Sequence, residues 1–317
     1  MNQKPAPEVS VQEMAELGLF ECRALEIDCS GVRSGKPFSL DIFLDEQPYT
    51  LDLIPKNLRG KNFRVRIQIE DGSYQEVDPP APMTFHGQVR GKPESEVAAS
   101  FIDGKLHAMI LLSNADSELF FIQPRLQGQG YVEYNNFEVI TDDRWNDGHI
   151  LNPELTEEEL NGGDSVPLGP PSGYFYLTEI ALDADYEFYG KNNYNLNTTI
   201  ADMESVMNGV STVYERDVQI TWVINEIIVR TSEPDPYDKI TATGILNQFQ
   251  AQWNNHHTDI IRDVAHLMTG KQIEGSTIGL AWVKAICSSW SGYGIVQSRF
   301  TQNYDQRVAL SAHEIGH

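Results

Sequence analysis

The chain has 317 residues, of which 40% are hydrophobic and 22% are charged, and its formal net charge is −23. This length allows two domains of ordinary size, each with its own core, and no apolar run in the sequence is long enough to span a bilayer. The strong negative charge argues against nucleic acid or an anionic membrane surface as a partner. Solubility alone accounts for such a charge.

Residues 18–140 have the pattern of a β-rich domain. Residues 63–69 alternate apolar and polar side chains, as a half-buried strand does. Further strands are predicted at residues 106–112 and 118–123, separated by Gly, Pro, Asn and Asp turns. The chain then becomes acidic and afterwards rich in Gly and Pro, without a sustained apolar face, which is typical of a linker. We therefore expect a β-rich domain at 1–152, a linker at 153–172 and a second domain at 173–317.

Strands and helices alternate after the linker. Apolar residues recur at helical spacing from Ile200 to Tyr214 and again from Ile240 to Trp253, which predicts two amphipathic helices. A final helix carries the last residues of the chain. Strands are predicted at residues 174–182, 220–229, 263–268, 277–283 and 293–297. Such alternation predicts a layered α/β domain with a mixed, mostly parallel five-stranded sheet, and an α+β multidomain fold for the whole chain.

The last five residues, His313 to His317, read HEIGH. Two histidines four apart on a helix project from one face, so both imidazoles can bind one zinc ion. The glutamate between them, Glu314, can then act as the general base toward water that the metal activates. A chance match in a chain with eight histidines arises roughly once in a hundred such chains, so the motif is informative but not sufficient. A catalytic zinc needs a third protein ligand, and we expect this ligand to lie beyond residue 317.

Four further segments accompany the motif in a fixed order. They are residues 176–185 (YLTEIALDAD), 263–270 (DVAHLMTG), 277–283 (TIGLAWV, with Cys287 just beyond) and 294–297 (GIVQ). Around HEIGH, these segments resemble the opening strand, third strand, substrate-binding edge strand and following strand of the reprolysin (adamalysin, ADAM-type) branch of the metzincin zinc peptidases. The resemblance implies the upper part of a catalytic domain, whose lower subdomain and methionine-containing turn would follow residue 317.

The resemblance also implies roles for particular residues. It makes His313 and His317 zinc ligands and Glu314 the catalytic base of an endopeptidase that acts on proteins or peptides. It further implies an exposed sheet edge above the metal, where an extended peptide adds as one more strand, formed by Gly279, Leu280, Ala281 and Trp282.

A calcium ion is a further expectation from the resemblance. In some relatives, positions that match Glu179 and Asp263 help to hold a structural Ca²⁺. Two carboxylates are too few for the six to eight oxygens that calcium prefers, and the remaining ligands would fall outside this chain.

The first half of the chain resembles the propeptide of the same peptidases. The matches are residues 48–53 and the Gly and Ser pattern between Phe85 and Gly104, with a generic β-sandwich as the alternative. This resemblance implies a secreted zymogen with an intramolecular propeptide, although the first thirty residues show no signal-peptide pattern.

Latency takes an unfamiliar form in this sequence. Many relatives bind a propeptide cysteine to the zinc, but no cysteine occurs between Cys29 and Cys287. Our hypothesis is that a polar residue just before the linker caps the metal instead, the candidates being Asp142, Asp143, Asp147 and His149. We also expect the chain by itself to bind zinc weakly and to cleave nothing.

Two alternatives to the metzincin interpretation stay open. One is an HExxH peptidase of another clan, in which a downstream glutamate is the third ligand. The other is a non-catalytic binding or adhesion module on the same fold. An intact His-Glu-His set counts against that module, because a protein without catalysis has no chemical need for Glu314.

Overall fold

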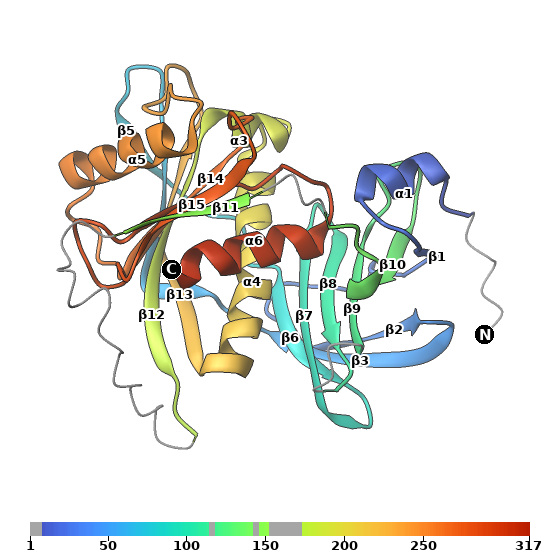
Figure 1. The fold of residues 1–317 in the computed structure, drawn as a ribbon. Helices are drawn as coiled ribbons and strands as arrows, with labels where there is room; N and C mark the ends of the chain where they lie inside the picture. Colours follow the sequence, from blue (N-terminus) through green and yellow to red (C-terminus); the bar gives the residue numbers. More distant parts are fainter. Residues whose placement is uncertain (1–7, 114–117, 142–145, 152–172) are drawn as a thin grey trace.

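The computed structural model describes residues 8–113, 118–141, 146–151 and 173–317, and every structural statement below concerns these residues. Their strands form two eight-stranded sheets, and the long helix α4 (Leu196–Val218) lies between the sheets (Figure 1). We call the described residues before 152 the N-terminal half and residues 173–317 the C-terminal half. None of the helices within these residues is long and apolar enough to cross a membrane.

The first sheet is antiparallel along every neighbouring pair of strands. Its order is β1-β10-β9-β8-β7-β6-β3-β2, and β8 and β9 confirm the strands predicted at 106–112 and 118–123. Apolar side chains on one face form a buried core that includes Ile42, Leu51 and Phe85. Its strands are β1 (Arg23–Leu25), β2 (Phe38–Leu44), β3 (Gln47–Pro55), β6 (Thr84–Val89), β7 (Lys92–Ile102), β8 (Lys105–Leu111), β9 (Leu119–Pro124) and β10 (Tyr131–Asn135), with the helices α1 (Val11–Leu17) and η2 (Asn136–Glu138) beside them.

The second sheet has the order β11-β15-β16-β14-β12-β13-β4-β5. Neighbouring strands are parallel except for β15 with β16 and β4 with β5. The five central strands are those that the sequence predicts after the linker. The strands are β4 (Arg59–Gln68), β5 (Tyr74–Val77), β11 (Asn146–Leu151), β12 (Tyr176–Ala184), β13 (Ile220–Arg230), β14 (Val264–Thr269), β15 (Thr277–Val283) and β16 (Tyr293–Gln297).

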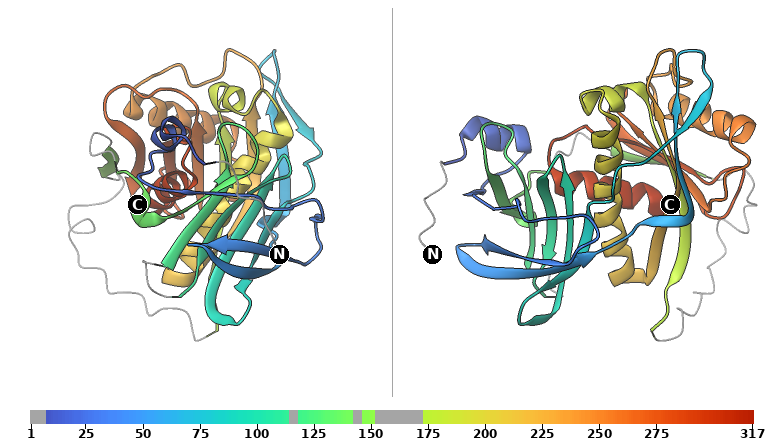
Figure 2. Two further views of the ribbon diagram at one scale, coloured as in Figure 1. Left: turned by 90° about the vertical axis from the view of Figure 1, so that its right-hand side faces the viewer. Right: turned by 180° about the vertical axis from the view of Figure 1, so that it is seen from behind.

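The five-stranded sheet expected from the sequence is therefore corrected to eight strands. The three added strands come from the N-terminal half: β11 lies on one edge, and the β4–β5 hairpin extends the other. In Figure 2 (right), this hairpin runs from the N-terminal half to lie among the elements of the C-terminal half. The physical reason is that each edge of a five-stranded sheet leaves backbone N–H and C=O groups without partners. The division at 152 and 173 stays a prediction, and the sheets do not follow it.

The helices cover both faces of the second sheet. Successive side chains of β12 point to opposite faces, so Ile180 and Leu182 join the core under α4, whereas Ala181 joins the core under α5 (Ala242–His256). On α5, the buried residues Ile245, Leu246, Phe249 and Trp253 follow helical spacing, as predicted, whereas Ile240 lies before the helix and is exposed. The final helix α6 (Tyr304–Gly316) joins the α4 side, and α3 (Tyr186–Lys191) follows β12 directly.

Candidate metal centre

Helix α6 brings the residues of the HEIGH motif together. The side chain of Asn303 accepts a hydrogen bond from the Gln306 backbone N–H at 3.2 Å and so caps the start of the helix. At the other end, the rings of His313 and His317 lie one turn apart, with their centroids 4.6 Å apart and their planes at 84°. One ligand atom each from these two histidines and from Glu314 lies within 4.8 Å of the others.

The donor set of this cluster suits zinc. Imidazole nitrogens are common zinc ligands, and a catalytic zinc has three protein ligands and an open position for water. His313 and His317 offer two such ligands. His313 is exposed and His317 is partly exposed, so solvent and substrate can reach this face. Glu314 is 2% exposed, so its carboxylate is buried beside the two rings. Within the part of the chain that the structure describes, this is the one group of three metal-ligating side chains.

An ion pair buried under α6 fixes the helix to α4. Both terminal nitrogens of Arg307 donate to the Asp202 carboxylate at 2.9 Å, and Arg307 Nε donates to the Ser298 carbonyl at 2.7 Å. Arg299 contacts the same carboxylate at 2.8 Å. Burial alone would raise the pKa of Asp202, but the two guanidinium groups hold it below its ordinary value. The ion pair therefore stays charged at neutral pH and sets the position of α6.

Two close contacts fix the last turns of α6. A Cβ at Gly209 of α4 would lie 2.8 Å from a methyl group of Val308, so glycine lets the two helices approach closely. Further along, the Tyr214 hydroxyl donates to the Ala312 carbonyl at 2.8 Å. The backbone N–H of Lys284, just after β15, donates to the His317 carbonyl at 2.6 Å. The histidine-bearing turn is thus held from α4 on one side and from β15 on the other.

The N-terminal half fixes the start of α6. Asn303 Nδ2 donates to the Leu17 carbonyl at 3.1 Å, and the Tyr134 hydroxyl donates to Asn303 Oδ1 at 3.2 Å. Gln123 Oε1 accepts from the Tyr304 backbone N–H at 2.8 Å. These residues were not expected to matter to the site, because nothing in their local sequence indicates a contact more than 160 positions away.

Strand β15 forms the wall beside Glu314. A Cβ at Gly279 would lie 2.2 Å from Glu314 Oε1, so the carboxylate rests against the bare backbone of this strand. Ala281 and Trp282 line a cavity of about 20 Å³ together with Glu314 and His317. The structure therefore brings three of the four predicted substrate-binding residues, Gly279, Ala281 and Trp282, next to the metal cluster. Leu280 is buried on the α5 side, and Trp282, two residues further along the strand, also packs against that core.

A buried histidine lies at the floor of the same cavity. His266 on β14 is fully buried, and neither ring nitrogen has a hydrogen-bond partner among the described residues. Burial lowers its pKa to about 3, so the ring is neutral. It is not part of the metal-ligating group found among the described residues.

The edge of β15 is not free. Strand β11 pairs with it in parallel, with Asp147 opposite Gly279, Gly148 opposite Leu280 and Ile150 opposite Trp282. The expectation of an exposed edge is thus wrong for this chain, because β11 occupies it. Two of the residues hypothesised to cap the metal, Asp142 and Asp143, lie outside the described residues, as do the side chains of Asp147 and His149.

Glu179 and Asp263 lie together but serve the protein's own groups. Asp263 accepts from the Glu179 backbone N–H at 2.8 Å and from the Cys287 thiol at 3.4 Å. Glu179 Oε1 accepts from the Asn225 side-chain amide at 2.7 Å. These two residues belong to no group of three metal-ligating side chains in the described parts of the chain, and nothing supports calcium here.

Comparison with known proteins gives a family match for the C-terminal half. Residues 177–317 match the family model Reprolysin_5, metallo-peptidase family M12. A solved structure described as "Structure of a chaperone-substrate complex" is similar over 66% of this chain, with 13% sequence identity and a TM-score of 0.37. The present chain covers 27% of that one. The mixed α/β fold with many strands and few helices is consistent with an M12 catalytic domain.

Proposed function

We propose that the protein is a secreted zinc-dependent endopeptidase, described here in a latent pro-form in which its own N-terminal half covers the substrate edge. The match of residues 177–317 to family M12 supports a metallopeptidase, and peptidases of that family use zinc and act on peptides. The observation that carries the proposal is the convergence of His313, Glu314 and His317 within 4.8 Å beside strand β15.

Each of these residues has a chemical role in the proposal. His313 and His317 would hold the metal through their imidazole nitrogens. Zinc, when bound, supplies a Lewis acid that polarises the scissile carbonyl and makes water more acidic. Glu314 accepts a proton from the attacking water at its carboxylate and then passes it to the leaving amine. Gly279 supports this role, because its lack of a side chain lets the Glu314 carboxylate lie against β15.

Latency in this proposal follows from the pairing of β11 with β15. A peptide that adds to the β15 edge needs the backbone groups that β11 now occupies. Gly148 lies so close to β15 that its Cβ would be 2.5 Å from Leu280 Cδ1 and 3.3 Å from the Gly279 carbonyl oxygen. Cleavage therefore requires β11 to leave the edge of β15. Latency of this kind needs no cysteine bound to the metal.

Zinc binding tests the metal site. We expect weak binding of one zinc ion by the 317-residue chain, with loss of that binding in His313→Ala and His317→Ala. The matched control is His256→Ala, because His256 is an exposed histidine at the end of α5. Zinc binding that survives both substitutions in α6 would refute the metal assignment.

Peptide cleavage tests the role of Glu314. Turnover is measured in a protein that carries the third zinc ligand and whose β15 edge has been opened by Gly148→Val, because the latent form should not cleave. Glu314→Gln should keep the zinc and abolish cleavage of an unstructured protein substrate. Unchanged cleavage in Glu314→Gln would exclude this residue as the base. No cleavage by either form, with zinc bound, would favour the non-catalytic binding module.

Amide hydrogen exchange tests the cover over β15. Gly148→Val adds a branched side chain where three atoms of β15 are already close, so β11 should leave the edge. We expect faster exchange at the β15 amides and unchanged exchange in β14. The control is Gly31→Val, since a Cβ at Gly31 meets no atom within 4 Å. Equal protection of β15 in Gly148→Val and in the parent would contradict the proposed cover.

A further inference from the structure

The edge of the second sheet opposite to the metal site is completed by the N-terminal half. Strand β4 pairs in parallel with β13, with Arg64 opposite Glu226 and Gln68 opposite Arg230. Strand β5 pairs with β4 and becomes the outer strand. Val65 of β4 is fully buried in the core that lies under α4. The hairpin is therefore an integral part of this sheet.

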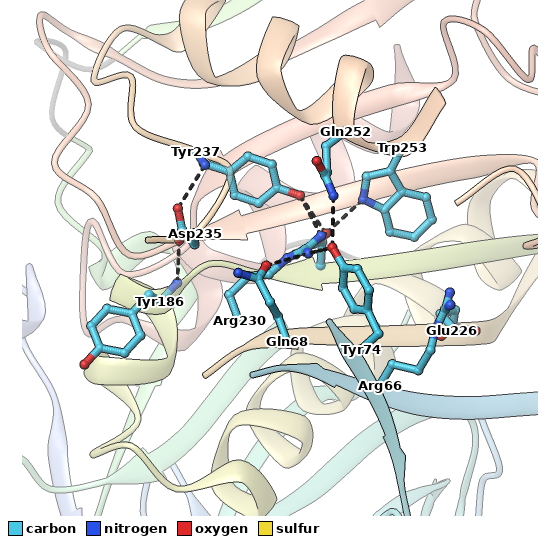
Figure 3. Close-up of polar contacts among 11 residues, drawn as sticks. Arg66, Gln68, Tyr74, Tyr186, Glu226, Arg230, Asp235, Tyr237, Gln252 and Trp253 are labelled. Carbon is cyan, nitrogen blue, oxygen red and sulfur yellow. Dashed lines mark hydrogen bonds and ion pairs between the residues drawn. The ribbon is translucent and has the colours of Figure 1, made fainter. Parts of the chain in front are cut away.

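A buried charge cluster connects the hairpin to the C-terminal half (Figure 3). Arg230 and Asp183 are both fully buried and form an ion pair with two contacts, Nε to Oδ1 at 3.0 Å and Nη2 to Oδ2 at 2.5 Å. The third nitrogen, Nη1, donates to Gln68 Oε1 at 2.9 Å and to the Tyr74 hydroxyl. Both acceptors belong to the hairpin. Without the hairpin, Nη1 of Arg230 would therefore lose both of these hydrogen-bond acceptors.

A second buried carboxylate depends entirely on the hairpin. Glu226 of β13 is 1% exposed, and its two oxygens accept from Arg64 Nε at 2.6 Å and Arg66 Nε at 2.5 Å. Burial raises the pKa of Glu226 more strongly than the two arginines lower it. Both cations come from β4, so loss of the hairpin removes every ion-pair partner seen for this carboxylate in the described residues.

The same two halves meet again along α4. The Asn208 side-chain amide donates to the Phe85 and Ala99 carbonyls, each at 3.1 Å, and these lie in the first sheet. Arg59 donates from two nitrogens to the Glu204 carboxylate, at 2.6 and 3.2 Å. One hydrophobic core is shared as well, with members from both halves: Leu58, Val65, Met109, Phe121, Ile180, Leu182, Met203 and Ile227. A shared core of this kind is typical of permanent interfaces rather than removable ones.

We propose that the β13 edge is a permanent binding surface for the β4–β5 hairpin, so that a chain cut between β11 and β12 stays together as a two-chain complex. The partner for this surface is the N-terminal piece of the same protein. The hairpin completes the sheet, neutralises Glu226 and supplies acceptors to Arg230. Opening of the β15 edge then requires only β11 to leave, while the β4–β5 hairpin stays bound. This consequence rests on the proposed function. The retained complex itself depends on neither zinc nor catalysis.

The test uses the 317-residue chain with a specific protease site placed within residues 153–172. After the cut, size-exclusion chromatography at micromolar concentration should show both pieces eluting together at the size of the intact protein. In a urea titration, separation of the pieces should coincide with the fluorescence change of Trp222 and Trp253, which are buried in the C-terminal half. A C-terminal piece that stays folded after the other piece has left would overturn the proposal, as would separation without urea.

Substitutions in the hairpin identify the surface. Arg64→Ala with Arg66→Ala should weaken association of the cut pieces by about tenfold or more. The matched control, Arg33→Ala with Arg90→Ala, removes the same charge from exposed positions of the same half and should change nothing. Adding Glu226→Gln to the first pair should restore much of the association, because the uncompensated charge is gone. Equal association of the first pair and its control would show that this edge is not the binding surface.

Discussion

The Glu314 carboxylate rests against the backbone of Gly279, so closely that a Cβ on this residue would lie 2.2 Å from Oε1 and 2.7 Å from the carboxylate carbon. Position 279 of β15 thus requires glycine because the Glu314 side chain packs against it, and not because of its own backbone conformation. The contact joins the two parts of the proposed site, because one residue carries the general base and the other lies on the strand to which substrate would add.

Gly279→Ala should therefore displace Glu314 while leaving the fold intact. Forcing a methyl group into this contact should lower the free energy of unfolding by about 1–3 kcal/mol. In a protein with the complete metal site, a displacement of about 1 Å should slow peptide cleavage by about a hundredfold. Urea unfolding and turnover are the measurements, with Gly31→Ala as the control because its Cβ meets no neighbour. Wild-type turnover in Gly279→Ala would show that the Glu314 position is unimportant.

Asp202→Asn should strongly destabilise the protein. This carboxylate is fully buried and balances Arg299 and Arg307, so its loss leaves buried cations without their partner. Breaking a buried ion pair costs about 3–5 kcal/mol in the free energy of unfolding. The control is Asp217→Asn, in an exposed pair with Arg216. Similar urea midpoints for the two variants would contradict the structural role of Asp202.

Tyr214→Phe should loosen the turn that carries the histidines. It removes the hydrogen bond from the Tyr214 hydroxyl to the Ala312 carbonyl at 2.8 Å, which should cost about 1 kcal/mol in the free energy of unfolding. We expect weaker zinc binding as well, because Ala312 directly precedes His313. Tyr174→Phe at an exposed position is the control, and isothermal titration with zinc compares the two. Unaltered zinc affinity in Tyr214→Phe would mean that this hydrogen bond does not position the histidines.

His257→Phe should reduce the sensitivity of the protein to acid. His257 is fully buried, neither ring nitrogen has a hydrogen-bond partner among the described residues, and burial with the nearby Arg230 lowers its pKa to about 3. The unfolded chain takes up this proton near pH 6.5, so between pH 6.5 and 3 the unfolded state binds more protons than the folded state. Stability is therefore lost as the pH falls, by about 1.4 kcal/mol per pH unit from this side chain.

The pH experiment compares urea unfolding of the parent and of His257→Phe at several pH values. As the pH falls from 6.5 to 5, the free energy of unfolding of the variant should rise by about 2 kcal/mol relative to that of the parent. His256→Phe, at the exposed neighbouring position, should show no such rise. Parallel pH curves for His257→Phe and the parent would contradict a neutral buried ring.

Local sequence patterns predicted individual elements well. The strands at 277–283 and 293–297 were predicted with the bounds that β15 and β16 have, and the apolar residues from Ile200 to Tyr214 lie on α4. The HEIGH spacing placed both histidines on one face of a helix, where their rings meet. These features depend on periodicity within a segment, which a single sequence records.

Pairings between distant segments were not predictable in the same way. Residues 63–69 were correctly predicted as strand, but alternation does not say which sheet a strand joins, and β4 pairs with β13. Strand β11 has only six residues, and no pattern in its sequence indicated that it pairs with β15. Asp202, the acidic residue that holds α6, lies within the apolar helical pattern of α4. Its partner Arg307 lies on another helix, so the pair could be identified only from the structure.

The anchoring of α6 at Asn303 has a mechanical consequence. The helix starts on the Leu17 carbonyl and the Tyr134 hydroxyl of the N-terminal half and ends at the histidines, about 20 Å away at 1.5 Å per residue. The position of the imidazoles thus depends on a part of the molecule that is distant in the sequence. A tilt of α6 by about 3° at Asn303 would shift the imidazoles by about 1 Å, and a misplacement of about 1 Å can slow a catalysed reaction by about a hundredfold.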